Sequence, residues 1–164
     1  MTRQLLIIVA ALATLGAACE PRPAADEKNA GGLDAVFEKE PLIVVSDDGK
    51  RHNFDVYIAA DYQQQRRGLM FVRKLPETKG MLFVYENTGV RSMWMKNTYI
   101  PLDMIFARAD GSVSSVIHDT VPQTLESQFS TEPVKFVLEL NAGTARRLRI
   151  GRHSRLIRAT SGSE

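Results

Sequence analysis

The sequence predicts an α+β domain built on a small, mostly antiparallel β-sheet that is curled or barrel-like and carries two short helices. Short apolar runs rich in β-branched residues recur along the chain, and turns containing glycine or aspartate separate them. Only two segments combine a helix-capping residue with a short helical stretch. The 164 residues, 44% of them hydrophobic, are enough for one domain with a single core.

The N-terminal end predicts export. Arg3 precedes an apolar run over residues 5–15, and the small residues 16–18 lead to Cys19, the sole cysteine. Such a run is typical of a secretory signal and is shorter than the roughly 20 residues that cross a membrane. We expect residues 1–18 to be removed and Cys19 to be lipidated, which gives a periplasmic protein anchored to a membrane. Ordinary cleavage nearby, which would release a soluble exported protein, is the alternative.

Residues 19–41 predict a flexible tether between this anchor and the domain. Prolines, glycines and scattered charged residues fill the segment, and it offers few apolar side chains to bury. The folded domain is expected over residues 42–160, followed by a disordered tail at residues 161–164.

A β-hairpin is expected first in the domain. An apolar run at residues 42–45 and an alternating run at residues 52–59 flank the Asp-Asp-Gly-Lys sequence of residues 47–50. Aspartate and glycine favour tight turns, and alternation is typical of a strand with one buried face. The two runs therefore predict a pair of antiparallel strands.

A short helix is expected after the hairpin. Asp61 is a good N-cap, and Gln64 three residues later completes a pattern close to a capping box. Two arginines in the last turn suit the negative end of the helix dipole, and Gly68 predicts a left-handed stop. Residues 69–72, Leu-Met-Phe-Val, are then expected to return to the core.

The second half of the chain predicts further strands and one more helix. Apolar runs predict strands, a polar stretch with two prolines predicts a long loop, and Asn141 is expected to cap the second helix. The expected strands are residues 80–85, 113–118, 134–140 and 154–159, the loop is residues 121–133, and the second helix ends near residue 149.

The charge balance excludes one class of partner. The 21 basic and 19 acidic residues give a net charge of +2, which is too balanced for bulk nucleic-acid binding, and no nucleic-acid-binding motif is present. Six arginines nevertheless crowd the end of the chain: Arg146, Arg147, Arg149, Arg152, Arg155 and Arg158. This basic end could hold an anionic partner or a membrane surface, or it could be a solvated face of the fold.

The best candidate site lies in residues 90–106, which contain the only tryptophan. A flat aromatic ring beside amide, hydroxyl, ammonium and carboxylate groups suits a polar ligand such as an envelope glycan or a peptide. The candidate ligand-binding residues are Trp94, Lys96, Asn97, Thr98 and Asp103, with Arg67 as an anion contact. On this interpretation, Asp103→Ala leaves the fold intact and abolishes ligand binding.

Two other interpretations of Asp103 are open. As scaffold, Asn97 and Asp103 would tie backbone groups in a tight crossover of the chain. In an envelope glycan hydrolase, Asp103 would act as acid or base beside a second carboxylate within roughly 5–9.5 Å. Glu139 and Asp55 are the candidates for that second carboxylate.

A copper(I)-handling protein is a further alternative. It would use the thioethers of Met93 and Met95, because soft sulfur ligands bind copper(I). Met70, Met81 and Met104 would join them from neighbouring strands. Methionine is equally a filler of hydrophobic cores, so the same residues also fit a purely structural role.

The sequence contains no recognisable catalytic motif. The serine elbow of many hydrolases is absent, and Cys19, if lipidated, offers no free thiol. His118 and Asp119 form the only adjacent pair of a histidine and a carboxylate, which also fits a surface pair. The sequence therefore predicts no cofactor and no resident metal, and a non-enzymatic binding or accessory domain is the first hypothesis.

Five short motifs resemble one known family. In order along the chain they are RGLM at 67–70, GMLF at 80–83, WMKNT at 94–98, IPLD at 100–103 and LELNAG at 138–143. These strings resemble the DUF192 family, also called UPF0127, over residues 42–157. The resemblance implies a compact β-rich domain of bacteria and archaea that is commonly exported or membrane-anchored, and it implies no reaction. Members often carry Gly-Asp where this chain has His153-Ser154, and an aromatic residue where it has Met93.

Overall fold

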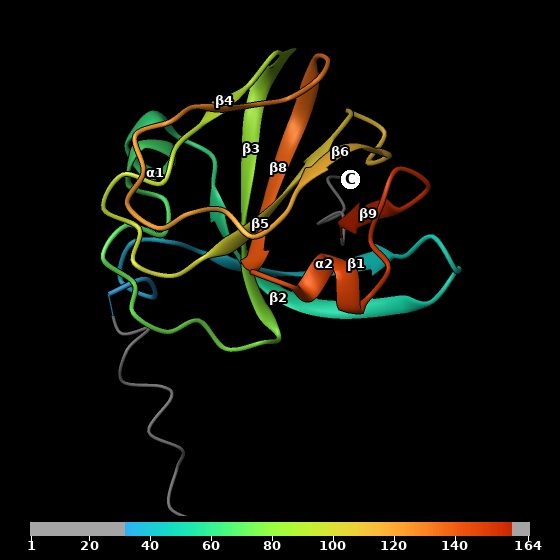
Figure 1. The fold of residues 1–164 in the computed structure, drawn as a ribbon, viewed down its shortest axis with the longest axis horizontal. Helices are drawn as coiled ribbons and strands as arrows, with labels where there is room; N and C mark the ends of the chain where they lie inside the picture. Colours follow the sequence, from blue (N-terminus) through green and yellow to red (C-terminus); the bar gives the residue numbers. More distant parts are fainter. Residues whose placement is uncertain (1–31, 159–164) are drawn as a thin grey trace, which may run out of the picture.

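The computed structural model describes residues 32–158. One seven-stranded sheet forms the domain, and a two-stranded ribbon and two short helices complete it (Figure 1). The strands are β1 (Lys39–Val45), β2 (Arg51–Ala59), β3 (Lys79–Gly89), β4 (Ser92–Met93), β5 (Leu102–Ala107), β6 (Val113–Ile117), β7 (Gln128–Phe129), β8 (Val134–Asn141) and β9 (Arg155–Arg158). The helices are α1 (Tyr62–Arg67) and α2 (Thr144–Arg147).

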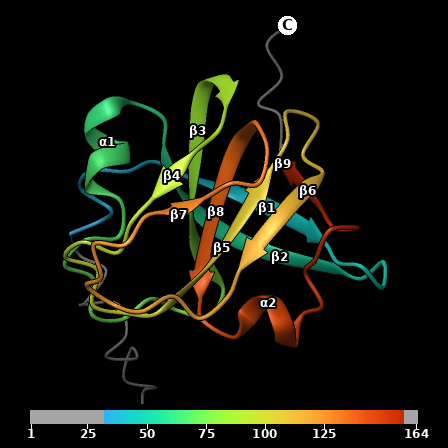
Figure 2. The same ribbon diagram turned by 45° about the horizontal axis from the view of Figure 1, so that its top comes forward.

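The sheet is mostly antiparallel and curled, which confirms the predicted fold class. Its strand order is β6-β5-β8-β3-β2-β1-β9, and β4 pairs with β7 in the separate ribbon (Figure 2). β1 and β2 form the expected hairpin. Only β2 and β3 run parallel within the described part of the chain, because the connection between them crosses over through α1.

The curl brings the two outer strands of the sheet together along a short seam. Val113 N donates to Ser154 O at 3.0 Å, Leu156 N donates to Gly111 O at 2.8 Å, and Ser112 forms a β-bridge with Arg155. Gly111 has a φ of +84°, and a Cβ atom there would lie 2.2 Å from the Leu156 carbonyl oxygen. Glycine is therefore needed at this position for both its backbone conformation and its small size.

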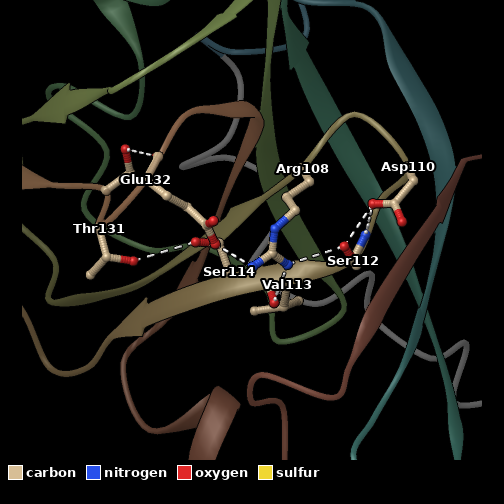
Figure 3. A network of polar contacts seen from close by, with 8 residues as sticks. Arg108, Asp110, Ser112, Val113, Ser114, Thr131 and Glu132 are labelled. Carbon is tan, nitrogen blue, oxygen red and sulfur yellow. Dashed lines mark hydrogen bonds and ion pairs between the residues drawn. The ribbon is translucent and has the colours of Figure 1, made fainter.

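A polar network holds the turn beside the seam in place. Figure 3 shows the Arg108 guanidinium between Ser112 and Glu132, which belongs to the segment leading into β8. Arg108 Nη1 donates to Ser112 Oγ and to Val113 O, both at 3.2 Å. Asp110 Oδ1 accepts from Ser112 N at 2.9 Å. These bonds fix the β5–β6 turn against a segment more than 20 residues away in sequence.

Apolar side chains form two clusters, one on each face of the sheet. The inner cluster receives residues from all seven strands of the sheet, so it fills the inside of the curl, and Ala145 of α2 joins it. The outer cluster packs between the other face and the segments that cover it, including Leu33, Leu69 and Met95. Alternation along β8 places Leu138 in the inner cluster and Val137 in the outer one.

Helix α1 begins with the expected capping box. Gln64 N donates to Asp61 Oδ1 at 2.8 Å, and Asp61 N donates to Gln64 Oε1 at 3.3 Å. The helix ends at Gly68 as expected, and the Gly68 N–H donates to Gln64 O at 2.8 Å. With a φ of +45° and a ψ of −142°, however, this glycine is not in the expected left-handed helical conformation. Local sequence alone therefore sets both ends of this helix.

Asp61→Ala is expected to lower the free energy of unfolding by about 1 kcal/mol, because it removes the acceptor for an otherwise unsatisfied amide of the first turn. Urea unfolding followed by circular dichroism measures the change. Gln63→Ala is the matched control on the same helix and should change stability by less than about 0.5 kcal/mol. Equal effects of the two substitutions would contradict a capping role for Asp61.

Two local predictions were wrong. Asn141 ends β8 instead of capping α2. Its side-chain Nδ2 donates to Leu75 O at 2.8 Å, in the loop that precedes β3, so it does not cap the helix. Helix α2 starts after Gly143, which has a φ of +81° and no side-chain capping bond.

Phe71, expected in the core, is 52% exposed with a φ of +68°. Its N–H donates to Asn97 O at 2.8 Å, which turns the ring outward.

Two expected irregular segments contain ordered structure. Leu33 and Phe37 are buried in the outer cluster and β1 begins at Lys39, so the packed domain includes residues 33–41 of the expected tether. The expected loop at residues 121–133 contains β7, which pairs with β4. Neither segment shows a sequence period, because only Leu33 and Phe37 of the first segment reach the core and no apolar side chain of the second segment does.

The expectations for the ends of the chain lie outside the described residues. The signal segment at residues 1–18, Cys19, the first part of the tether and the tail at residues 161–164 all fall there. Within residues 32–158, no helix is both long and apolar enough to cross a membrane.

Candidate functional site

A small pocket opens on the outer face of the sheet, beside the C-terminal end of α1. Its empty space of about 270 Å³ includes open solvent, so the pocket is a shallow recess in the surface. Leu69, Met70, Phe83 and Met93 form its apolar walls, while the end of α1 and residue 94 border its mouth. The most buried polar residue that lines it is Glu139 of β8, which we define as its floor. The pocket therefore combines an apolar wall with a polar floor.

Trp94 stands at the mouth of this pocket. Met93, the last residue of β4, is buried, and the next residue turns outward, so the indole is 46% exposed. Lys96 Nζ lies 5.1 Å from the centroid of the indole ring, within the range of a cation–π contact. Lys96 is thus brought to the site by its contact with Trp94.

Asn97 and Thr98 form the turn that follows. Thr98 N donates to Met95 O at 3.0 Å, and Asn97 adopts a φ of +56°, a conformation that asparagine tolerates better than most residues. Thr98 is buried and lines the pocket. Asn97 does not line it, and its carbonyl accepts from Phe71 N, which ties the turn to the segment after α1.

Arg67, for which the sequence predicts an anion contact, also lines the pocket. It is the last residue of α1, so the N-terminal capping box and Gly68 together fix its position. Its Cζ atom lies 5.3 Å from the centroid of the Phe71 ring. The outward turn of Phe71 thereby provides a surface that holds the guanidinium near the mouth.

Glu139 is the residue that sequence reasoning missed as a pocket residue. It is 4% exposed, and burial raises the pKa of its carboxyl group to about 8. No side chain or amide among residues 32–158 hydrogen-bonds to this carboxyl group. The sequence did contain a signal for this role. Glu139 lies two residues from Val137 on the same strand, so it is a charged residue on a side of the strand that faces the core.

Tyr85 is the titratable neighbour of Glu139. Burial raises the pKa of the Tyr85 hydroxyl to about 12; the Glu139 charge adds to this effect, and Arg91 opposes it. The Tyr85 hydroxyl donates to Met93 Sδ at 3.4 Å. Tyr85 is therefore an uncharged donor near the floor of the pocket at neutral pH.

Asp103 lies on the opposite face of the sheet from the pocket. It pairs with Leu140 on β8 and is fully buried, whereas Glu139 pairs with Met104 and faces the outer cluster. Asp103 Oδ1 accepts from Asp119 N at 3.0 Å, and Oδ2 accepts from Ala145 N at 2.7 Å. The carboxylate thus caps α2 in place of Gly143.

The structure brings together part of the predicted ligand-binding set. Three of the six residues line the pocket: Trp94, Thr98 and Arg67. Lys96 borders the pocket through Trp94, whereas Asn97 and Asp103 do not line it.

A family model matches residues 43–157 of the chain, and it is that of DUF192, described as an uncharacterised ACR. The chain belongs to the DUF192 family. The matched range runs from within β1 to within β9 and includes both helices, so family membership covers most of the sheet together with the pocket.

Two solved structures are similar to this DUF192 domain. One, from Sinorhizobium meliloti 1021, is described as a candidate transcription regulator; it is 41% identical, with 75% of this chain and 95% of that chain covered and a TM-score of 0.73. The other, a protein of unknown function from Novosphingobium aromaticivorans DSM 12444, is 29% identical, with 90% and 99% covered and a TM-score of 0.72. No curated protein matches the chain.

The two methionines of the copper alternative, Met93 and Met95, occupy different places in the DUF192 domain. Met95 is fully buried, and its Sδ accepts from Thr120 Oγ1 at 3.2 Å. Met93 and Met70 line the pocket from different segments. Within residues 32–158, no three His, Cys, Asp or Glu residues group as a metal site.

The arginine-rich end of the DUF192 domain is largely neutralised by its own acidic residues. Five of the six arginines form ion pairs: Arg146 with Asp119, Arg147 with Glu77, Arg149 with Asp48, Arg155 with Asp110 and Arg158 with Glu40. These pairs favour the interpretation of a solvated face, since the charges already have partners within the fold.

Proposed function

We propose that this DUF192 domain is a cell-envelope accessory domain that binds a small polar ligand, a glycan or peptide unit, in the pocket below Trp94. The observation that carries the proposal is the Glu139 carboxyl group, which is buried at the floor of an open pocket without a hydrogen-bond partner in the described residues. Such a group costs free energy that a ligand would recover. The export signal predicted at residues 1–18, with lipidation of Cys19, supports the envelope as its location.

The shape and chemistry of the pocket support a ligand of modest size. The pocket is a shallow recess whose empty space is partly open solvent, so it receives one small group of a ligand while the rest of the ligand stays outside. The half-exposed indole of Trp94 offers a flat surface to a sugar ring or a peptide plane. A polar group of a sugar or amino-acid residue, with the residue itself lying against the indole, is the unit that suits this recess.

The contacts of Asp103 favour binding over hydrolysis. Both of its carboxylate oxygens accept hydrogen bonds from backbone amides, and Glu139 lies on the other face of the sheet. A glycosidase needs two carboxyl groups that face one sugar across a shared cleft. The placement of these two residues offers no such cleft to a glycan hydrolase based on Asp103.

Trp94→Ala is expected to weaken ligand binding by about tenfold or more, because it removes the main aromatic surface at the mouth. N-acetylglucosamine, glucuronate and N-acetylalanine serve as probes, and isothermal calorimetry measures the affinity. Trp94 is the only tryptophan, so a change in its fluorescence in the wild type reports binding at this site.

Phe129→Ala is the matched control for this prediction. Phe129 lies on β7, is an exposed aromatic residue and does not line the pocket. Its substitution should change affinity by less than twofold. Binding that survives Trp94→Ala, or that both substitutions weaken equally, would overturn the proposed site.

A further inference from the structure

We propose that the ligand of this pocket carries a carboxylate group, held between Arg67 at the mouth and the Glu139 carboxyl group at the floor. The inference rests on the proposed function and assigns the chemical class of the ligand. Two features of the pocket carry the inference: the cationic side chains at its mouth and the hydrogen-bond donor at its floor.

Cationic side chains surround the mouth of the pocket. Arg66 and Arg67 line it, and Lys96 borders it through its contact with Trp94. None of the three forms an ion pair with a carboxylate of the described residues; their charged groups lie instead over the aromatic rings of Tyr62, Phe71 and Trp94. The mouth therefore presents positive charge that no acidic group of the described fold neutralises.

The floor is a hydrogen-bond donor at neutral pH. Burial holds the pKa of Glu139 at about 8, so the carboxyl group keeps its proton and can donate its O–H to an acceptor on the ligand. Tyr85 of β3 is the other titratable group facing it, and β5 contributes the apolar Met104. Arg66 and Arg67 face the pocket from α1. Burial accounts for the raised pKa of Glu139, and neither arginine contributes to that shift. The two cations therefore act on a ligand at the mouth and leave the Glu139 proton in place.

A carboxylate satisfies both ends of this arrangement. One oxygen can accept from the guanidinium of Arg67 and the other from the protonated carboxyl group, and hydrogen bonds to charged groups are the strong ones. An ammonium group would meet repulsion from three cations at the mouth. It would also gain a charged partner at the floor only if Glu139 ionised, at an added free-energy cost.

The test compares charged and uncharged probes of the same shape by calorimetry at pH 7. Glucuronate is paired with glucose, and N-acetylalanine with N-acetylalanine amide, so the two pairs also distinguish an acidic sugar from a peptide carboxylate. We expect at least one carboxylate probe to bind about tenfold more tightly than its uncharged partner. Equal affinity within both pairs would overturn the carboxylate inference and leave the proposed function standing. Failure of all four probes to bind would overturn both.

Arg67→Met should lower the affinity for the bound carboxylate about tenfold, the effect of losing one charge-assisted hydrogen bond. Arg73→Met is the matched control, because Arg73 also lies over an aromatic ring, 4.9 Å from the centroid of Tyr99, and does not line the pocket. It should change affinity by less than twofold. Equal effects of the two substitutions would contradict a direct contact.

The pH dependence tests the floor. Between pH 7 and pH 9 the probe stays ionised while Glu139 loses its proton around pH 8, so wild-type affinity should fall about tenfold. Glu139→Gln cannot titrate, and its affinity should not change over this range. A wild-type affinity that is constant or rises with pH would exclude donation by the Glu139 carboxyl group.

Discussion

At pH 9 the Glu139→Gln variant is expected to be more stable than the wild type by several kcal/mol. Glu139 is almost fully buried and has no hydrogen-bond partner in the described residues, so ionising it inside the fold is costly. Glutamine has nearly the same shape and carries no charge at any pH. Denaturant unfolding of both proteins at pH 5, 7 and 9 measures the difference.

The sign of this effect follows from proton linkage. The pKa of Glu139 is raised from 4.5 to about 8 in the folded state, so between these values the folded protein holds a proton that the unfolded chain has lost. Stability of the wild type therefore falls as pH rises through this window, by about 5 kcal/mol in total. The variant lacks this contribution, so its advantage over the wild type should grow with pH and level off above pH 8.

Glu86→Gln is the control for general charge effects. Glu86 lies on β3 and is exposed, so its substitution should leave the pH profile parallel to that of the wild type. A Glu139→Gln profile that also runs parallel to the wild type would show that Glu139 ionises freely in the folded protein.

The second large effect is expected for Asp103→Ala, which should lower the free energy of unfolding by about 3–5 kcal/mol. The substitution removes two hydrogen bonds to a buried carboxylate and leaves Ala145 N and Asp119 N without their acceptor. Because the first of these amides belongs to the opening turn of α2, the helix and the segment after β6 should both loosen. Urea unfolding measures the loss, and hydrogen exchange locates it.

Two further variants define the role of Asp103. Asp103→Asn retains one acceptor oxygen and should lose less stability than alanine does. Asp55→Ala removes an exposed aspartate from β2 and should change stability by less than about 0.5 kcal/mol. From sequence alone we expected Asp103→Ala to leave the fold intact and to abolish binding. An alanine variant with wild-type stability would favour that expectation over the scaffold role.

Much of the fold was predictable because its signals are local. The capping box of Asp61 and Gln64 and the alternating pattern of β2 each depend on residues a few positions apart. The prediction for Asn141 failed because a capping residue and a strand-end residue look alike until the partner is known. That partner, Leu75, is 66 residues away.

The candidate site was predictable in part, for a related reason. Trp94, Thr98 and Arg67 meet at one pocket, as their residue types suggested. Sequence could not show that Asp103 and Glu139 lie on opposite faces, since strand alternation gives relative sides within a strand and does not relate one strand to another. The pairing register of β5 with β8 supplies that relation.

The seam at Gly111 and Leu156 has a consequence for solubility. An open seven-stranded sheet would offer the full edges of β6 and β9 to other chains, and unpaired strand edges template aggregation. The curl joins these edges through two backbone hydrogen bonds, from Val113 N to Ser154 O and from Leu156 N to Gly111 O. These four backbone groups are therefore not available to a strand from another chain. Within the described part of the chain β9 has four residues, and the seam covers the start of this short edge. The closure that shapes the core thus also keeps the sheet from growing beyond its own chain.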